Sequence, residues 1–124
     1  MKDEGTAASP DLKARTKNLA LRVIRMFSAL PKTTEARVLG RQLLRSGTSV
    51  GANYREAQRA RSKAEFIAKI GDCLKELDES ADWLELLSDA GIVASEKLSA
   101  LRDECDQLLA IFTTISKNSK SSPS

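Results

Sequence analysis

Arginine is the residue type whose spacing in this sequence most clearly suggests chemistry. Arg37 and Arg55 are 18 residues apart, as are Arg41 and Arg59, and 18 residues make five whole helical turns. With Arg45 they would cover only about 80° of one helix surface. A guanidinium group is planar, permanently charged and able to bind phosphate or carboxylate through two parallel hydrogen bonds. The spacing therefore predicts an anion-binding arginine stripe.

The anion that this stripe would bind stays open between two classes. Glu35 and Glu56 are the only acidic side chains of the same segment, so a partner must come from elsewhere. Phosphates of RNA or DNA are one match, and carboxylates of a neighbouring subunit or a partner protein are the other. Both fit the charge distribution, because residues 31–64 carry eight basic and two acidic side chains whereas residues 65–116 carry four and twelve.

Side chains that catalyse reactions are scarce. The chain has no histidine, which excludes Ser-His and Cys-His nucleophile pairs and histidine-based metal sites. No GxxxxGK[ST] or GxGxxG segment is present. Cys73 and Cys105 are too few for a disulfide framework or a zinc site and are expected to be reduced core thiols. We expect no enzymatic activity, no catalytic residue, no metal and no cofactor.

The elements that position the arginines are expected to be α-helices in one domain. The 124 residues are 41% apolar and only 4% aromatic, and they favour strong helix formers. No segment approaches the roughly 18 apolar residues of a membrane span, and no export signal opens the chain. We expect a cytoplasmic protein without membrane contact.

Apolar residues at three- and four-residue spacing predict four amphipathic helices. Short connections favour an all-α, antiparallel up-down-up-down four-helix bundle over residues 10–116. A flexible N-terminus (1–9) and a disordered polar tail (117–124) are expected to flank it. The expected helices extend from a Ser9 cap with Pro10 in the first turn to Leu30, from Thr34 to Ala60, from a Ser62 cap to Gly91, and from a Ser95 cap to Ile115.

Three glycines lie in the second expected helix, where each lowers helix stability by up to about 1 kcal/mol relative to alanine. At about 100° per residue, Gly40, Gly47 and Gly51 fall within about 40° of one another. We expect this strip to let a neighbouring helix approach closely. A phosphate-binding loop is the less favoured alternative, since it would require the helix to break at the glycines.

An apolar surface is expected on the third helix. Trp83 and Leu86 would project more than about 90° away from the centre of its core-forming face, with Leu87 near the boundary. Large apolar side chains at such positions mark interfaces more often than ligand pockets. We predict that Trp83, Leu86 and Leu87 contribute to a subunit interface.

A long segment of the sequence resembles a known family. It runs from Gly40 to Leu87 and reads GRQLLRSGTSVGANYREAQRARSKAEFIAKIGDCLKELDESADWLELL. It is similar to the bacterial four helix bundle proteins encoded in intervening sequences of 23S ribosomal RNA genes. The resemblance lies in S-V-x-x-N followed by E, and in R-S-x-x-E-F. Many relatives read like N-I-A-E-G where Asn53 is here followed by Tyr54, Arg55, Glu56 and Ala57.

The resemblance implies an antiparallel four-helix bundle that assembles as a ring, typically a homopentamer, without established enzymatic activity. A related group serves as the accessory subunit of diversity-generating retroelements, a basic barrel that engages reverse transcriptase and nucleic acid. By analogy, the resemblance implies binding to RNA, DNA or a ribonucleoprotein.

Overall fold

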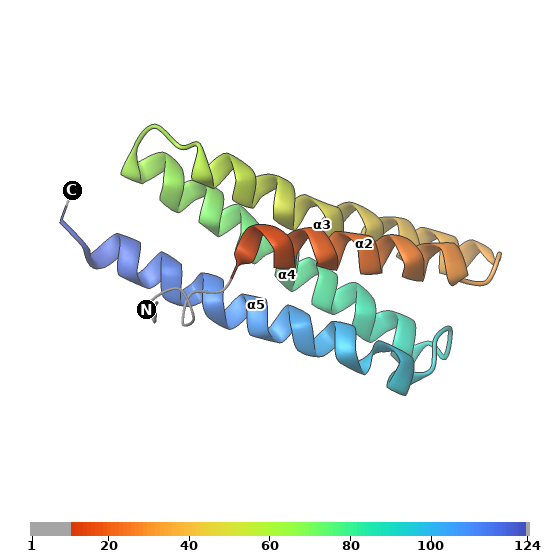
Figure 1. Ribbon diagram of the computed structural model, residues 1–124. Helices are drawn as coiled ribbons and strands as arrows, with labels where there is room; N and C mark the ends of the chain where they lie inside the picture. Colours follow the sequence, from red (N-terminus) through yellow and green to blue (C-terminus); the bar gives the residue numbers. More distant parts are fainter. Residues whose placement is uncertain (1–10, 124) are drawn as a thin grey trace.

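The computed structural model describes residues 11–123, and this part of the chain is all-helical, with four helices and no strand (Figure 1). The predicted all-α class with four helices is thus confirmed. The predicted flexible segment 1–9 lies outside the described residues. The helices are α2 (Leu12–Ala29), α3 (Thr34–Gln58), α4 (Lys63–Asp89) and α5 (Ser95–Ser121).

Side-chain caps fix the first residue of three helices. Asp11, Thr33 and Ser62 each accept a hydrogen bond from the backbone N–H three residues later, at 3.0–3.3 Å. Each cap satisfies one of the N–H groups that a helix start leaves unpaired. The predicted Ser62 cap is confirmed, although the Glu65 carboxylate accepts from the Arg61 N–H at 3.2 Å rather than from that of Ser62.

Two helix starts differ from the sequence-based prediction. Asp11 caps α2, whereas the predicted cap Ser9 and the predicted first-turn Pro10 lie outside the described residues. Ser95 is not a cap but the first residue of α5, because the extended backbone ends at Ala94, which has no capping side chain. A serine within one residue of a helix start gives no signal that separates these two positions.

The last helix extends further than predicted. Residues 117–121 of the predicted disordered tail belong to α5, and Ser116 just before them is buried. The Lys63 ammonium group at the start of α4 donates a hydrogen bond to the Ser122 carbonyl. Once a helix is nucleated, each further residue adds a hydrogen bond at little cost. The helix therefore continues past its predicted end at Ile115.

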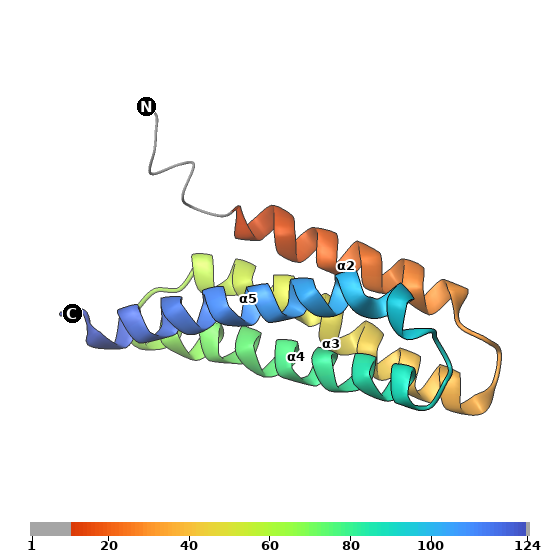
Figure 2. The same cartoon turned by 90° about the horizontal axis from the view of Figure 1, so that it is seen from below.

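Contacts between helices define the directions of α2, α3 and α4. As residue numbers rise along α3 from Gly40 to Gly51, the contacting residues fall from Leu30, the C-cap of α2, to Thr16 within α2. Positions 45 and 56 of α3 likewise pair with positions 79 and 69 of α4. The chain reverses at each connection (Figure 1), and the α2–α3 and α4–α5 connections lie at the same end (Figure 2). Consecutive helices pack together, while α2 and α5 make little contact.

The core contains few polar groups, and the central ones are hydrogen bonded. The hydroxyls of Ser46 (α3) and Ser80 (α4) lie 2.8 Å apart, and the Thr16 hydroxyl donates to the Leu12 carbonyl at 2.7 Å. These bonds matter because a buried hydroxyl without a partner is costly. The largest fully buried apolar side chains come from all four helices: Leu19, Leu43, Ile70, Leu77, Leu84, Leu87, Leu98, Leu108 and Phe112.

Candidate nucleic-acid interface

Four arginines of the predicted stripe lie on α3 and the fifth, Arg59, is the C-cap residue of that helix, but the five do not share one environment. Arg37 is half-buried, whereas Arg41, Arg45, Arg55 and Arg59 are exposed. The Thr33 cap sets the start of α3. The five side chains thus differ in how far they are exposed to a partner.

Arg45 is neutralised within its own chain. Its guanidinium group lies 2.5 Å from a Glu79 oxygen and 3.3 Å from a Glu76 oxygen, both on α4. The hydrogen bond to Glu79 is the main cause of the raised pKa of Arg45. Because the Arg45 side chain is 51% exposed, the pair contributes only about 0–1 kcal/mol to stability. For this arginine the partner is a carboxylate pair of the same subunit.

The other four arginines are not paired in this way. The Glu56 carboxylate accepts a hydrogen bond from the Lys69 ammonium group at 2.7 Å, and this bond lowers the pKa of Glu56. The remaining stripe residues are Arg37, Arg41, Arg55 and Arg59. Within residues 11–123, no carboxylate oxygen lies within 4.0 Å of their guanidinium nitrogens. Among the described residues, no direct ion pair neutralises these four charges.

The glycine strip explains how these arginines come to border α2. A Cβ at Gly40 would lie 2.5 Å from Leu30 Cδ1, one at Gly47 2.8 Å from Val23 Cγ2, and one at Gly51 3.2 Å from Thr16 Oγ1. Thr16 and Val23 belong to α2, and Leu30 is the C-cap residue of that helix. Because the glycines have no Cβ, α2 can lie close against α3, and the cations of the two helices can form one surface.

Basic residues of α2 extend this surface. The helix contains no aspartate or glutamate. At about 100° per residue, Lys13 and Lys17 lie on the opposite side of Thr16 from Arg15, which pairs with Glu104 of α5 at 2.7 Å. They therefore lie on the outer flank that adjoins α3. We define the basic face as Lys13, Lys17, Arg37, Arg41, Arg55 and Arg59.

The two lysines were missed by the sequence analysis, which considered one helix at a time. Arg55 lies about 40° from Gly51 around α3, on the side away from Ser46 and α4. This places the arginines beside α2. The signal that could have found Lys13 and Lys17 is the complete lack of acidic residues between positions 12 and 34.

The predicted interface residues separate into two environments. Leu86 is 45% exposed and Trp83 is half-buried, but Leu87 is 0% exposed, so its prediction as an interface residue is wrong. Leu87 lies seven residues after the buried Ser80, whose hydroxyl contacts Ser46 of α3, so its side chain points to the same side of α4, toward α3. The N–H groups of Ile92 and Val93 donate to the Leu87 carbonyl at 3.0 and 3.2 Å and end the helix there.

Trp83 presents its apolar surface rather than its polar atom. Its indole Nε1 is buried and has no hydrogen-bond partner in the described part of the chain. A partner that covers Trp83 would therefore contact carbon atoms.

Among residues 11–123, no group of three or more His, Cys, Asp or Glu side chains is placed to hold a metal ion. No helix in the same range combines the length and apolar character needed to cross a membrane.

Both cysteines are free thiols in the core. Cys73 and Cys105 are 0% and 1% exposed. Burial raises the pKa of each thiol from an ordinary 9.0 to about 12. Because the thiolate is the reactive form, the folded protein should protect both cysteines from thiol reagents.

This pKa shift predicts a pH-dependent stability. Above about pH 9 the unfolded chain loses the thiol protons while the folded chain keeps them, so the free energy of unfolding should fall with rising pH. The expected slope is up to about 1.4 kcal/mol per pH unit for each thiol, between about pH 9 and 12. Urea denaturation over this range measures it. The Cys73→Ala/Cys105→Ala variant should show a shallower slope, and an equal slope would contradict the assignment.

The fold and the site together define an all-α four-helix protein with a basic α2–α3 side and an acidic α4. The chain belongs to the 23S rRNA-intervening sequence protein family, whose model matches residues 11–114. A similar solved structure is a protein of unknown function of the S23 ribosomal protein family from Bacteroides thetaiotaomicron VPI-5482. It is 34% identical, with a TM-score of 0.80, and the match covers 85% of this chain and 97% of that chain. No curated protein matches the chain.

Proposed function

We propose that the protein is a non-enzymatic, homo-oligomeric nucleic-acid-binding protein of the cytoplasm, built as an antiparallel bundle, whose basic face contacts the phosphates of RNA or DNA. The observation that carries this proposal is the set of four arginines, three on α3 and one at its C-cap, without a carboxylate within 4.0 Å in residues 11–123. Acidic side chains of α4 pair with other cations instead, Glu76 and Glu79 with Arg45 and Asp72 with Lys69.

The dimensions of the basic face suit a nucleic-acid backbone. Arg37 and Arg59 are 22 positions apart, which corresponds to about 33 Å along a helix. Duplex DNA rises about 3.4 Å per phosphate of one strand, so this length matches the rise of about ten base pairs. The family description refers to 23S rRNA intervening sequences, which supports RNA as the first ligand to test.

Self-assembly is the second part of the proposal. Leu86 on α4 and Val38 on α3 are 45% and 52% exposed. The antiparallel register, with Ser46 opposite Ser80, brings these two side chains to about the same level along the pair. Together with Trp83 they form an apolar surface that a second copy would cover. The family resemblance favours a homopentamer.

An alternative role has its own supporting observation. The contact of Arg45 with Glu76 and Glu79 demonstrates that an arginine of α3 fits the acidic surface of an α4 helix. In an assembly module, the arginine stripe would pair with the acidic surface of neighbouring subunits or of a partner protein. Such pairing would compete with phosphate for the same guanidinium groups.

One titration tests the proposal against this alternative. The protein is titrated with structured RNA and with duplex DNA at two salt concentrations while its mass is monitored. We expect binding that weakens steeply with salt. Oligomers that form without binding either nucleic acid at low salt would overturn the proposal in favour of the assembly module.

Arg41→Ala and Arg45→Ala form a matched pair for the same experiment. Loss of a phosphate contact should reduce the slope of log K against log salt by about 1, and this is expected for Arg41→Ala. Arg45→Ala should change the slope by clearly less, since Glu76 and Glu79 already balance its charge. If both substitutions leave the salt dependence nearly unchanged, α3 is not part of the contact surface.

A further inference from the structure

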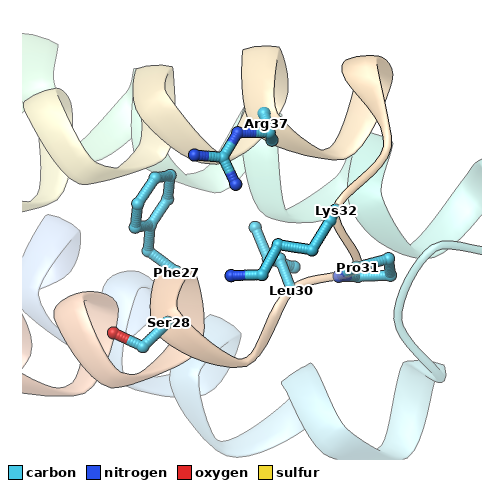
Figure 3. A pocket seen from close by; sticks show the side chains of 6 residues that line it. All are labelled: Phe27, Ser28, Leu30, Pro31, Lys32 and Arg37. Atoms are coloured by element: carbon cyan, nitrogen blue, oxygen red, sulfur yellow. The ribbon is translucent and has the colours of Figure 1, made fainter.

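A pocket at the α2–α3 connection combines two cations with an aromatic ring. It has a volume of about 250 Å³ and is lined by Phe27, Ser28, Leu30, Pro31, Lys32 and Arg37. Figure 3 shows the Arg37 guanidinium and the Lys32 ammonium groups turned toward the same space beside the Phe27 ring. The pocket lies at one end of the basic face, since Arg37 belongs to both.

The walls of this pocket are held in place by packing. The Phe27 ring packs against Gly40. A Cβ built at Gly40 would lie 2.9 Å from Phe27 Cδ1 and 2.5 Å from Leu30 Cδ1. Leu30 has extended backbone and is followed by Pro31, whose ring fixes its own φ angle. The pocket is therefore shaped before any ligand arrives, which lowers the entropic cost of binding.

Its positive charge is not balanced by neighbouring acids. No carboxylate oxygen lies within 4.0 Å of the Arg37 or Lys32 nitrogens in the described range 11–123. Glu35 is close in sequence but lies about 160° from Arg37 around α3. The Ser28 hydroxyl donates to the Ile24 carbonyl at 3.1 Å, so it forms part of the wall.

The combination selects one ligand chemistry. A simple anion would need the two cations but not the ring, and an apolar ligand would need the ring but not the cations. A nucleotide uses both, because its phosphate suits an arginine and a lysine while its base stacks on an aromatic side chain. A volume of about 250 Å³ is below the range of about 300–1,000 Å³ typical of sites for larger small molecules, which favours a single base.

We propose that this pocket binds one unpaired nucleotide, with its base against Phe27 and its phosphate between Arg37 and Lys32. The proposal rests on the proposed function and refines it, since it predicts a preference for strands with unpaired bases over continuous duplex. A duplex keeps its bases stacked and can use only the phosphate contacts of the basic face.

The test compares an RNA hairpin with an unpaired loop and a fully paired duplex of equal length. Phe27→Leu keeps the pocket wall apolar but removes the aromatic face. It should weaken hairpin binding about tenfold and leave duplex binding unchanged, whereas Arg41→Ala should weaken both. Lys32→Ala, on the exposed connection, should also weaken hairpin binding more than duplex binding, and it keeps the test valid if Phe27→Leu misfolds.

Two further arms distinguish the sources of the ligand. Free adenosine monophosphate, titrated alone and followed by NMR, should perturb the pocket weakly and lose this effect in Phe27→Leu. A poly-glutamate peptide should compete with the hairpin to the same extent in the unmodified protein and in Phe27→Leu.

The inference is overturned if Phe27→Leu and Lys32→Ala leave hairpin binding unchanged. The proposed function survives that result if Arg41→Ala still weakens binding of both RNAs. Absence of all nucleic-acid binding defeats the proposed function itself.

Discussion

Replacing Gly47 with leucine is expected to force α2 away from α3 and to lower the free energy of unfolding by about 3 kcal/mol or more. A Cβ at this position would already lie 2.8 Å from Val23 Cγ2 and 3.2 Å from Cγ1. Val23 cannot move aside, because it is 1% exposed and a β-branched side chain in a helix is largely confined to one rotamer. Chemical denaturation followed by circular dichroism measures the effect.

Gly71 provides the matched control for this prediction. It lies in α4, and a Cβ built there would meet nothing within 4 Å. Gly71→Ala should therefore stabilise the protein by about 0.5–1 kcal/mol through helix propensity alone. Gly47→Ala gains the same propensity but pushes against Val23, so its net effect should be destabilising. Equal stabilisation by the two alanine substitutions would contradict the close approach of α2 and α3.

Helix positions and the phase of α3 were predictable because they depend on local spacing. Apolar residues at three- and four-residue intervals located all four helices, and the arginine spacing placed the stripe on one helix. The end of α4 was also predictable from the local sequence, since Gly91 has a φ of 72°, a conformation that glycine adopts without strain. The spacing of apolar residues indicates a helix whichever neighbours that helix packs against.

Pairing between helices was not predictable in the same way. Arg45 meets Glu79, which is 34 positions away, and nothing in the spacing of either helix distinguishes this arginine from Arg41. The choice depends on the register and rotation of α3 against α4, which the Ser46–Ser80 contact helps to fix. Whether a phosphate or a carboxylate meets each arginine is thus a tertiary question.

Burial near a helix end was uncertain for a related reason. The helical phase puts Leu87 at the boundary of the core-forming face, and phase alone cannot decide on which side of that boundary it falls. The decision comes from the packing of α4 against α3, because Leu87 lies on the same side of α4 as Ser80, which contacts Ser46. How far that contact extends toward the end of α4 depends on the register of the two helices, which the spacing within one helix does not contain.

The second large effect is expected for Leu87→Ala, with Leu86→Ala as its neighbour and control. Leu87 is 0% exposed, so its truncation should lower the free energy of unfolding by about 2–5 kcal/mol. Leu86 is 45% exposed, and its truncation should change that energy by no more than about 0.5 kcal/mol. Denaturation at a protein concentration low enough to dissociate the oligomer measures both, because assembly adds a stability of its own that depends on concentration.

Sedimentation velocity separates the two residues in the opposite order. Leu86→Ala and Trp83→Ala should weaken the proposed oligomer and lower its sedimentation coefficient, because they remove apolar surface that a second copy would cover. If both variants sediment like the unmodified protein, assembly uses another surface. If Leu87→Ala reduces the oligomer while leaving stability intact, the side chain belongs to the interface after all. Opposite responses from adjacent leucines would locate the boundary between the core and the assembly surface within one residue of α4.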